Sequence, residues 1–256
     1  MSKLFRAEVV SNLTLNDKNN LLTLKPLEKV LKPEPGQFYM IEVSHTYDPL
    51  LKRPFSYLRR RVAELQFLYA VRGRGTSLMK KFKEGMVINM IGPLGRGYPR
   101  PRKDCMPLLV AGGTGIAPIF SLAEELPRKA YILHGAKCRD ELILMDELMG
   151  LGMESFLCTD DGSFGVKGTV ADALYDFLMH KASPSNHYVI FACGPRQMLE
   201  AVARVASEKG IRGYASLEEN MACGFGACLG CAVKTIHGYK RVCKEGPVFP
   251  IEDIVW

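Results

Sequence analysis

The sequence predicts a protein of mixed β and α/β class, with an antiparallel β-barrel, a parallel doubly wound domain and a small cysteine-rich segment. Short apolar runs separated by turn residues fill the first hundred residues, and strand and helix patterns alternate over the next hundred. Four of the eight cysteines lie between residues 223 and 243. We place the three domains at residues 1–100, 101–210 and 211–256.

The bulk composition is that of an ordinary globular protein, with 47% hydrophobic and 24% charged residues among 256. No run approaches the roughly 18–20 consecutive apolar residues that cross a bilayer. Arg6 and Glu8 interrupt the first apolar run, so no secretory signal core is expected. We therefore expect a cytoplasmic protein without a membrane partner.

The net charge of +7 raises the question of nucleic-acid binding. The basic residues are spread along the chain and lack the interleaved aromatic residues that stack on bases, so no nucleic-acid partner is expected. The densest basic run is Arg59–Arg61. It has two interpretations: a solvated face, or a docking surface for an anionic cofactor or partner.

The barrel is expected from strands that are short and closely spaced. We expect them at residues 5–10, 21–24, 38–43, 64–71 and 86–91, with one helix at 77–82.

A polar, proline-containing stretch at residues 97–104 is expected to be a linker to the second domain. Strands are then expected at 107–111, 130–135, 155–159 and 188–192, and helices at 117–126, 140–149, 169–179 and 196–207. This alternation is typical of a parallel, doubly wound sheet. After residue 211 the helical signal stops, and the remaining piece is too small for a core of its own, so metal coordination is expected to fix it.

The clustered cysteines have the spacing of a [2Fe–2S] site. Cys223, Cys228 and Cys231 form C-x4-C-x2-C, and Cys243 follows after eleven residues. Structural zinc sites usually carry two C-x2-C pairs, which fits this spacing poorly, and a reducing compartment disfavours disulfides. Zinc and unligated thiols remain as alternatives. Gly224, Gly226 and Gly230 are expected to supply positive φ angles and to leave backbone N–H groups for the sulfides.

A flavin-type motif lies in the barrel half, at Arg53-Pro54-Phe55-Ser56, with Gly75-Thr76 about twenty residues later. A guanidinium suits a pyrophosphate, and Ser56 can donate to a flavin ring nitrogen. The amides at the start of the following helix are an anion site, and Tyr69 is a candidate to stack beside the ring. Alone, the motif also fits an arginine that caps a loop and a serine in a turn.

A nicotinamide cleft is predicted where three loops leave the parallel strands. Gly112-Gly113-Thr114-Gly115 connects a strand to a helix, and Cys193-Gly194-Pro195 ends the last strand. Asp160–Ser163 follows a third strand, with its aspartates either as turn formers or as ligands. Cys193 is interpreted equally well as a neighbour of the nicotinamide and as a small buried residue. His134 is expected to be structural.

Together these motifs resemble the ferredoxin–NADP reductase superfamily, in the order R-P-F-S, G-T, G-G-T-G-I-A-P and C-G-P. The closing segments, residues 216–231 and 242–249, are similar to those of electron-transfer subunits of type B dihydroorotate dehydrogenase. In that family the catalytic partner is a separate FMN-containing protein that oxidises dihydroorotate in pyrimidine biosynthesis. Its electrons pass through the [2Fe–2S] cluster and FAD to NAD⁺. Such complexes are typically heterotetramers with two chains of each kind.

The resemblance implies that Arg53–Ser56, Leu68-Tyr69-Ala70 and Gly75-Thr76 contact FAD. Leu229 and Ala232 depart from the expected pattern of the cluster loop. Lys137 and Arg139 also depart, because cations after the second strand of the nucleotide domain favour a 2′-phosphate, which leaves NAD against NADP open. No residue resembles a base for the carbon-bound proton of dihydroorotate, so no catalytic residue is expected in this chain.

Two other interpretations stay open. One is the small subunit of an NADH-dependent ferredoxin:NADP or sulfide oxidoreductase, but those relatives tend to carry aspartate where this chain has Cys223. The other is an iron–sulfur redox sensor without turnover.

Overall fold

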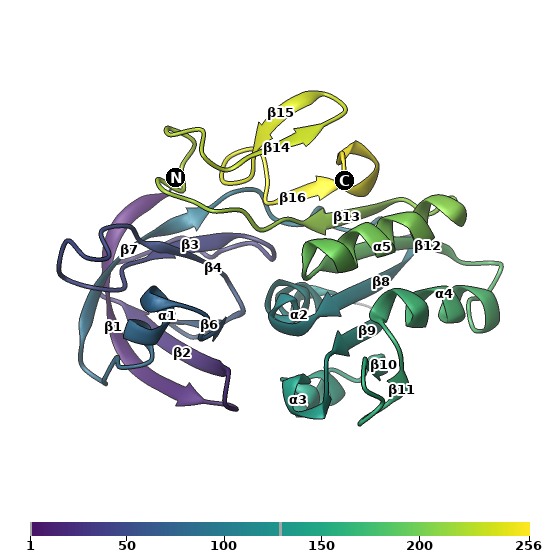
Figure 1. Ribbon diagram of the computed structural model, residues 1–256, viewed down its shortest axis with the longest axis horizontal. Coiled ribbons are helices and arrows are strands. Elements are labelled where there is room, and N and C mark those ends of the chain that lie inside the picture. The colour runs from purple at the N-terminus through teal and green to yellow at the C-terminus, as the bar shows by residue number, and fades with distance from the viewer. Residues whose placement is uncertain (1, 128–129) are drawn as a thin grey trace.

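A computed structural model describes residues 2–127 and 130–256 of the chain. Figure 1 shows the antiparallel sheet on one side, the parallel sheet with its helices on the other, and the C-terminal segment above their junction. Within the described ranges, no helix is both long and apolar enough to cross a membrane.

The N-terminal sheet is antiparallel, with the strand order β4-β3-β7-β1-β2-β6-β5. It curls so that β4 also contacts β6, which is not its hydrogen-bonded neighbour. Large side chains from alternate strand positions, such as Phe5, Tyr39 and Phe67, fill the inside. The strands are β1 (Lys3–Thr14), β2 (Asn19–Pro26), β3 (Phe38–Ile41), β4 (Arg53–Ser56), β5 (Arg59–Arg61), β6 (Glu64–Ala70) and β7 (Val87–Leu94).

The one helix of this part, α1 (Arg74–Met79), begins and ends three residues before the expected helix. Thr76 explains the earlier start. Its Oγ1 accepts hydrogen bonds from the backbone N–H groups of Arg72 (2.9 Å) and Gly73 (3.2 Å), which caps the first turn.

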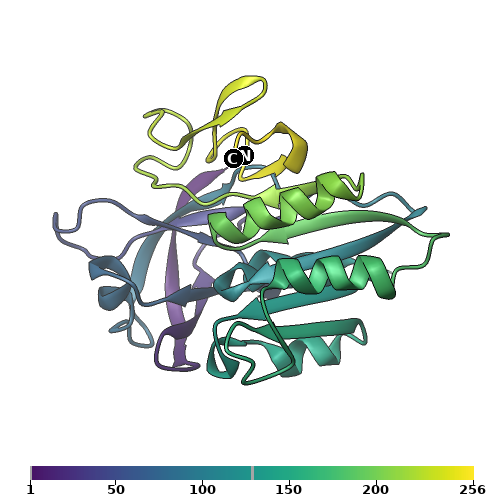
Figure 2. The ribbon, with the colours of Figure 1, turned by 45° about the vertical axis from the view of Figure 1, so that its right-hand side comes forward.

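The second sheet has the order β11-β10-β9-β8-β12-β13-β16 and is parallel except for β16. Helices α4 and α5 pack in one core and α2 and α3 in another, and Figure 2 shows α4 and α5 side by side on the near face. The strands are β8 (Cys105–Gly112), β9 (Tyr131–Ala136), β10 (Glu154–Thr159), β11 (Val166–Lys167), β12 (His187–Cys193), β13 (Gly213–Ser216) and β16 (Val248–Pro250). The helices are η1 (Gly113–Gly115), α2 (Ile116–Glu125), η2 (Arg139–Glu141), α3 (Met145–Gly150), α4 (Val170–His180) and α5 (Arg196–Glu208).

The single helix expected at 140–149 is two pieces, η2 and α3. Leu144 lies between them with a φ of 61°, a left-handed conformation that interrupts the helix. The Ile143 and Leu144 side chains nevertheless stay buried in the core shared with α2.

The C-terminal segment contributes to the second sheet and adds the hairpin β14 (Ala232–Thr235) and β15 (Gly238–Arg241), followed by η3 (Ile251–Asp253). β13 pairs with β12, and β16 pairs antiparallel with β13. Strand pairing therefore runs across the division expected between residues 210 and 211, and the ranges of the three domains stay a prediction.

One core joins all three parts of the molecule. It combines Phe38, Met40 and Leu94 from the barrel with residues of β8, β12, α4 and α5 and with Cys231 and Cys243. The C-terminal segment thus packs against both the barrel and the parallel sheet.

Candidate functional site

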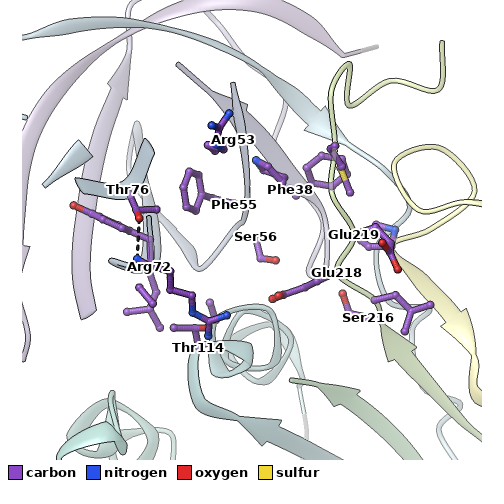
Figure 3. Close-up of a pocket in the computed structure, with 18 of the residues that line it drawn as sticks. Phe38, Arg53, Phe55, Ser56, Arg72, Thr76, Thr114, Ser216, Glu218 and Glu219 are labelled. Atoms are coloured by element: carbon purple, nitrogen blue, oxygen red, sulfur yellow. Dashed lines mark hydrogen bonds between the residues drawn. The ribbon is translucent and has the colours of Figure 1, made fainter. Parts of the chain in front are cut away.

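A cavity of about 450 Å³ lies where the barrel, the parallel sheet and the C-terminal segment meet. Figure 3 shows side chains from all three parts pointing into it. Of the residues that the sequence assigned to FAD or nicotinamide, its wall includes Arg53, Pro54, Phe55, Ser56, Leu68, Tyr69, Ala70, Thr76 and Thr114. The predicted flavin motif is therefore brought together in one place, although its elements are separated in the chain.

Arg53 is held at one end of this cavity by its own loop and by α1. Its Nη1 donates to the carbonyl oxygen of Leu51 at 2.6 Å. A Cβ at Gly75 would lie 3.1 Å from Arg53 Nε, so the side chain passes directly over this glycine. Gly75 thus makes room for the guanidinium instead of lining the cavity itself.

The apolar side of the cavity is fixed from inside the barrel. Tyr69 donates its hydroxyl to Asn12 Oδ1 at 3.0 Å, and its ring meets Phe55 edge-on with centroids 5.9 Å apart. Burial raises the pKa of Tyr69. With 1% of its surface exposed, Tyr69 is a rigid wall.

The glycine turn after β8 and the loop after β12 are in direct contact, as predicted for neighbouring strand ends. A Cβ at Gly115 would lie 2.3 Å from the Cys193 carbonyl oxygen and 2.7 Å from the Gly194 nitrogen. A Cβ at Gly112 would lie 3.1 Å from Pro195. Only glycine permits this approach.

Cys193 itself is buried, with 1% of its surface exposed, in the core beneath the turn. Burial raises the pKa of its thiol well above the usual range, Glu218 adds to the rise, and Ser216 opposes it. It does not line the cavity, nor do Gly113, Gly115, Gly194 or Pro195; of the two loops, Thr114 does.

Sequence reasoning missed part of the wall: Phe38, Arg72, Ala117, Pro247 and the stretch 216–221. In Figure 3 the Glu218 carboxylate extends toward the middle of the cavity, on the side of Ser56. Protein atoms crowd Glu218, although solvent reaches it, and this desolvation raises its pKa against the opposing charge of Arg72. The available signal was the S-L-E-E-N run just ahead of the first cluster cysteine.

The four clustered cysteines form two pairs. The Cys228 amide nitrogen lies 3.5 Å from Cys223 Sγ, and the Cys243 amide nitrogen lies 3.4 Å from Cys231 Sγ. Among the described residues, no three metal-binding side chains converge on a single position. Two pairs of thiols suit a centre with two irons and two protein ligands on each.

The loop between these cysteines presents its backbone N–H groups to sulfur. Burial acts to raise the pKa of Cys223, but hydrogen bonds from the backbone of Cys228 and Phe225 lower it to about 6. Burial and the neighbouring Cys231 raise the pKa of Cys243 to about 12.

The loop's backbone agrees with the prediction at Gly224 (φ 79°) and Gly226 (φ 89°) but not at Gly230. There the left-handed residue is Leu229, with φ 61°. The prediction for Gly230 was wrong because the tight turn falls one residue earlier than glycine placement indicates. Leu229 is also 62% exposed.

The cysteine loop borders the flavin-type cavity. A Cβ at Gly224 would lie 2.4 Å from Met40 Cγ on β3, so the loop lies directly on the barrel. Met221, two residues before Cys223, lines the cavity together with Phe38 and Pro247. The cysteine loop is thus adjacent to the cavity, while no cysteine is among the described residues that line it.

Three further sequence interpretations are resolved. Asp161 is a turn former, since its Oδ1 accepts hydrogen bonds from the Ser163 backbone nitrogen (2.9 Å) and hydroxyl (2.6 Å). His134 is fully buried, and burial lowers its pKa to about 4, against the opposing effect of a backbone contact with Gly113. The Arg59–Arg61 run is not one solvated face, because Arg59 is only 5% exposed.

Comparison with known proteins identifies the family to which the chain belongs. Residues 218–255 match the family model described as the iron–sulfur cluster binding domain of dihydroorotate dehydrogenase B, and residues 109–204 match an oxidoreductase NAD-binding domain. A dihydroorotate dehydrogenase B (NAD⁺) electron transfer subunit homolog from Aquifex aeolicus is 39% identical over 254 residues, covering 97% of both chains. The chain belongs to the family of type B dihydroorotate dehydrogenase electron-transfer subunits.

Other members and more distant structures agree. The electron-transfer subunit of Caldanaerobacter subterraneus subsp. tengcongensis is 37% identical, with 98% of each chain covered. The structure of an NADH-dependent reduced ferredoxin-NADP oxidoreductase superposes with a TM-score of 0.87 at 26% identity, covering 98% of this chain and 90% of that one. A ferredoxin NADP⁺ reductase from Neisseria gonorrhoeae, with bound FAD and NADP, shares the fold (TM-score 0.70, 18% identity, 86% and 95% covered). An electron-transfer subunit has, by its name, a catalytic partner.

Proposed function

We infer that this chain carries electrons from a dihydroorotate-oxidising partner to NAD⁺ in pyrimidine biosynthesis, with a [2Fe–2S] cluster and FAD as its own cofactors. The observation that carries the inference is that three parts of the chain line the same cavity. They are the barrel, the glycine turn and the stretch leading to Cys223. A flavin is needed between the two other carriers, because nicotinamide exchanges hydride whereas iron–sulfur clusters exchange single electrons.

The cavity's donor set fits FAD. Arg53, kept extended over Gly75, supplies a planar guanidinium for a pyrophosphate, and Thr76 caps the helix beside it. Ser56 offers a hydroxyl to a polar ring edge, while Phe55, Leu68 and Tyr69 form an apolar wall. These residues, with Pro54 and Ala70, would bind and orient the flavin and exclude water from it.

The two thiol pairs fit the cluster. Cys223 and Cys228 would hold one iron, and Cys231 and Cys243 the other, with backbone amides of the loop donating to sulfur.

NAD is proposed to bind at the glycine turn and its neighbouring loop, residues Gly113, Thr114, Gly115, Gly194 and Pro195, with Cys193 buried beneath them. The buried loop contact holds Thr114 at the cavity, where a nicotinamide would meet the flavin. The preference for NAD over NADP stays a prediction from the family, since Lys137 and Arg139 lie after β9.

The partner is proposed to be an FMN-containing catalytic subunit, in a heterotetramer of two chains of each kind in the cytoplasm. The deciding experiment is co-expression with such a protein, followed by purification and sedimentation. We expect a complex of that stoichiometry that reduces NAD⁺ with dihydroorotate, whereas this chain alone reduces dyes with NADH but not with dihydroorotate. Dihydroorotate oxidation by the isolated chain would contradict the division of labour.

A second candidate is favoured by the superposition with the NADH-dependent reduced ferredoxin-NADP oxidoreductase. Cys223 is the discriminating residue, since those relatives tend to carry aspartate there. Efficient dihydroorotate-independent transfer from reduced ferredoxin to NADP⁺, with no complex formed with the FMN protein, would favour it. Negligible NADH-dependent dye reduction and little bound flavin would instead indicate a redox sensor.

A further inference from the structure

Arg59 is a barrel residue whose charged end lies against the nucleotide-binding part. Its Nη1 is 3.8 Å from Glu124 Oε1 on α2, and its Nη2 is 3.7 Å from Glu147 Oε1 on α3. The guanidinium carbon lies 4.5 Å from the centre of the Phe120 ring, also on α2. One side chain of β5 therefore contacts two helices of the other domain.

Burying this cation is unfavourable in itself. The Arg59 side chain is 6% exposed, its Nε has no hydrogen-bond partner among the described residues, and burial lowers its pKa. Burial also raises the pKa of Glu124, with Arg59 opposing. Buried ion pairs add little net stability compared with apolar contacts, so stability alone does not explain an arginine here.

The position of α2 gives the reason. Figure 1 shows α2 on the side of the parallel sheet that faces the barrel. The helix follows the Gly113–Gly115 turn directly, and Ala117, one turn ahead of Phe120, lines the cavity with Thr114. Because a helix is stiff over two turns, fixing Phe120 and Glu124 also fixes the turn at its start.

We propose that Arg59 is a positioning residue that sets how closely the glycine turn, and the nicotinamide it holds, approaches the flavin cavity. The proposal rests on the proposed function, since it requires nicotinamide at this turn. Hydride transfer needs reacting atoms about 3–3.5 Å apart, and a misplacement of about 1 Å can cost roughly 100-fold in rate.

The chemistry of arginine suits this role better than that of lysine. A planar guanidinium stacks on a ring and reaches two carboxylates at once, whereas an ammonium is a single strongly hydrated point charge. Glu124 and Glu147 keep 33% and 40% of their side chains exposed, so both remain hydrated when the cation is removed. The variants below are therefore expected to fold.

The test compares Arg59→Met, Arg59→Lys and the double variant Glu124→Gln/Glu147→Gln, which removes both opposing charges and keeps the Phe120 contact. Arg61→Met is the matched control, because Arg61 is exposed on the same strand. Each FAD- and cluster-loaded chain is mixed with NADH in an anaerobic stopped-flow instrument. Flavin reduction, the long-wavelength flavin–nicotinamide charge-transfer absorbance, apparent NADH affinity, FAD content and the unfolding midpoint are recorded.

We expect flavin reduction to slow at least about tenfold in the Arg59 variants and in the double variant, with a weaker charge-transfer band. NADH affinity and FAD content should stay within about threefold, and Arg61→Met should match the wild type. Variants that only unfold at lower temperature, with wild-type reduction rate and charge-transfer band, would overturn the inference. Wild-type flavin that NADH fails to reduce would overturn the proposed function as well.

Discussion

The barrel contacts its two neighbours in different ways. Toward the C-terminal segment the contact is a shared apolar core with close backbone packing, in which Gly224 lies on Met40 and the Arg96 amide donates to the Gly246 carbonyl at 2.6 Å. Toward the nucleotide-binding part, the barrel residues Leu58, Leu68 and Tyr98 join a second apolar core, and ion pairs accompany this contact. Each pair has its cation on the barrel: Lys18 with Glu141, Lys32 with Glu125, and Arg59 with Glu124 and Glu147.

This difference matches what each contact has to do. The iron–sulfur cluster and the flavin stay bound throughout turnover. Electron transfer between them requires a constant separation, and a packed core provides it. Nicotinamide enters and leaves, and a polar rim is typical of interfaces whose parts adjust. The comparison predicts that changes at the first contact damage cofactor content and stability, while changes at the second alter nicotinamide chemistry.

The largest expected effect comes from Cys228→Ser. Removing one of four ligands should abolish the iron–sulfur absorbance and EPR signal and weaken the partner complex, while FAD stays bound, because the flavin residues lie in the barrel. Cys138→Ser, outside the cluster, is the control. A normal cluster signal in Cys228→Ser would show that the ligand assignment is wrong.

Arg53→Ala should come next. Loss of a charge-assisted contact of about 1.5–3 kcal/mol corresponds to FAD affinity roughly 10- to 150-fold weaker, with the cluster intact. Flavin content after purification and fluorescence titration measure it. Arg74→Ala, which removes an exposed arginine at the start of α1 that pairs with Asp48 in the loop before β4, should leave FAD bound. Equal flavin content in both variants would contradict the assignment of Arg53 to the pyrophosphate of FAD.

His134 makes the nucleotide-binding part sensitive to acid. Its pKa is about 4 in the folded chain against an ordinary 6.5, so the unfolded state binds more protons between these values. Stability from this group is present above pH 6.5 and is lost as the pH falls toward 4, by on the order of 3 kcal/mol. His134→Gln should flatten the pH dependence of unfolding in this window, whereas the exposed His187→Gln should not. If His134→Gln left the pH dependence of the unfolding free energy unchanged, a lowered pKa of His134 in the folded chain would be contradicted.

Comparing Gly224→Ala with Gly238→Ala separates the effect of packing from that of backbone strain where the cysteine loop lies on the barrel. Gly224 and Gly238 both have positive φ, but only a Cβ at Gly224 meets a neighbour. Gly238→Ala should cost about 1–2 kcal/mol, and Gly224→Ala about 1–3 kcal/mol more. Chemical denaturation and iron content test this, and equal costs would indicate that the loop is not packed on β3.

Lys32→Met should have the smallest effect. Lys32 lies 2.9 Å from Glu125 but is 65% exposed, so the pair contributes at most about 1 kcal/mol, less at high salt. Unfolding at low and high ionic strength measures it, with the exposed Lys29→Met as control. A salt-independent loss would mean that the rim is less hydrated than its exposure indicates.

Much of this organisation was predictable from local pattern. The alternating strands and helices, the cysteine spacing and the Arg53–Ser56 motif are short-range features that sequence carries directly. What escaped prediction depends on distant partners. Nothing near Arg59 indicates that its side chain would be buried against α2, and the S-L-E-E-N run around Glu218 does not by itself indicate a cavity wall. Leu229, and not Gly230, adopts the left-handed conformation, which residue type alone does not report.

β13 and β16 carry a last consequence. These strands complete the sheet of the nucleotide-binding part, yet they flank the cysteines on either side in the chain. Cutting the polypeptide before β13 would leave β12 as a bare apolar edge, open to pairing with other chains. We therefore expect the barrel and nucleotide-binding parts to aggregate when this flank is removed, because the segment that holds the cysteines is structurally continuous with the sheet and is not a detachable module.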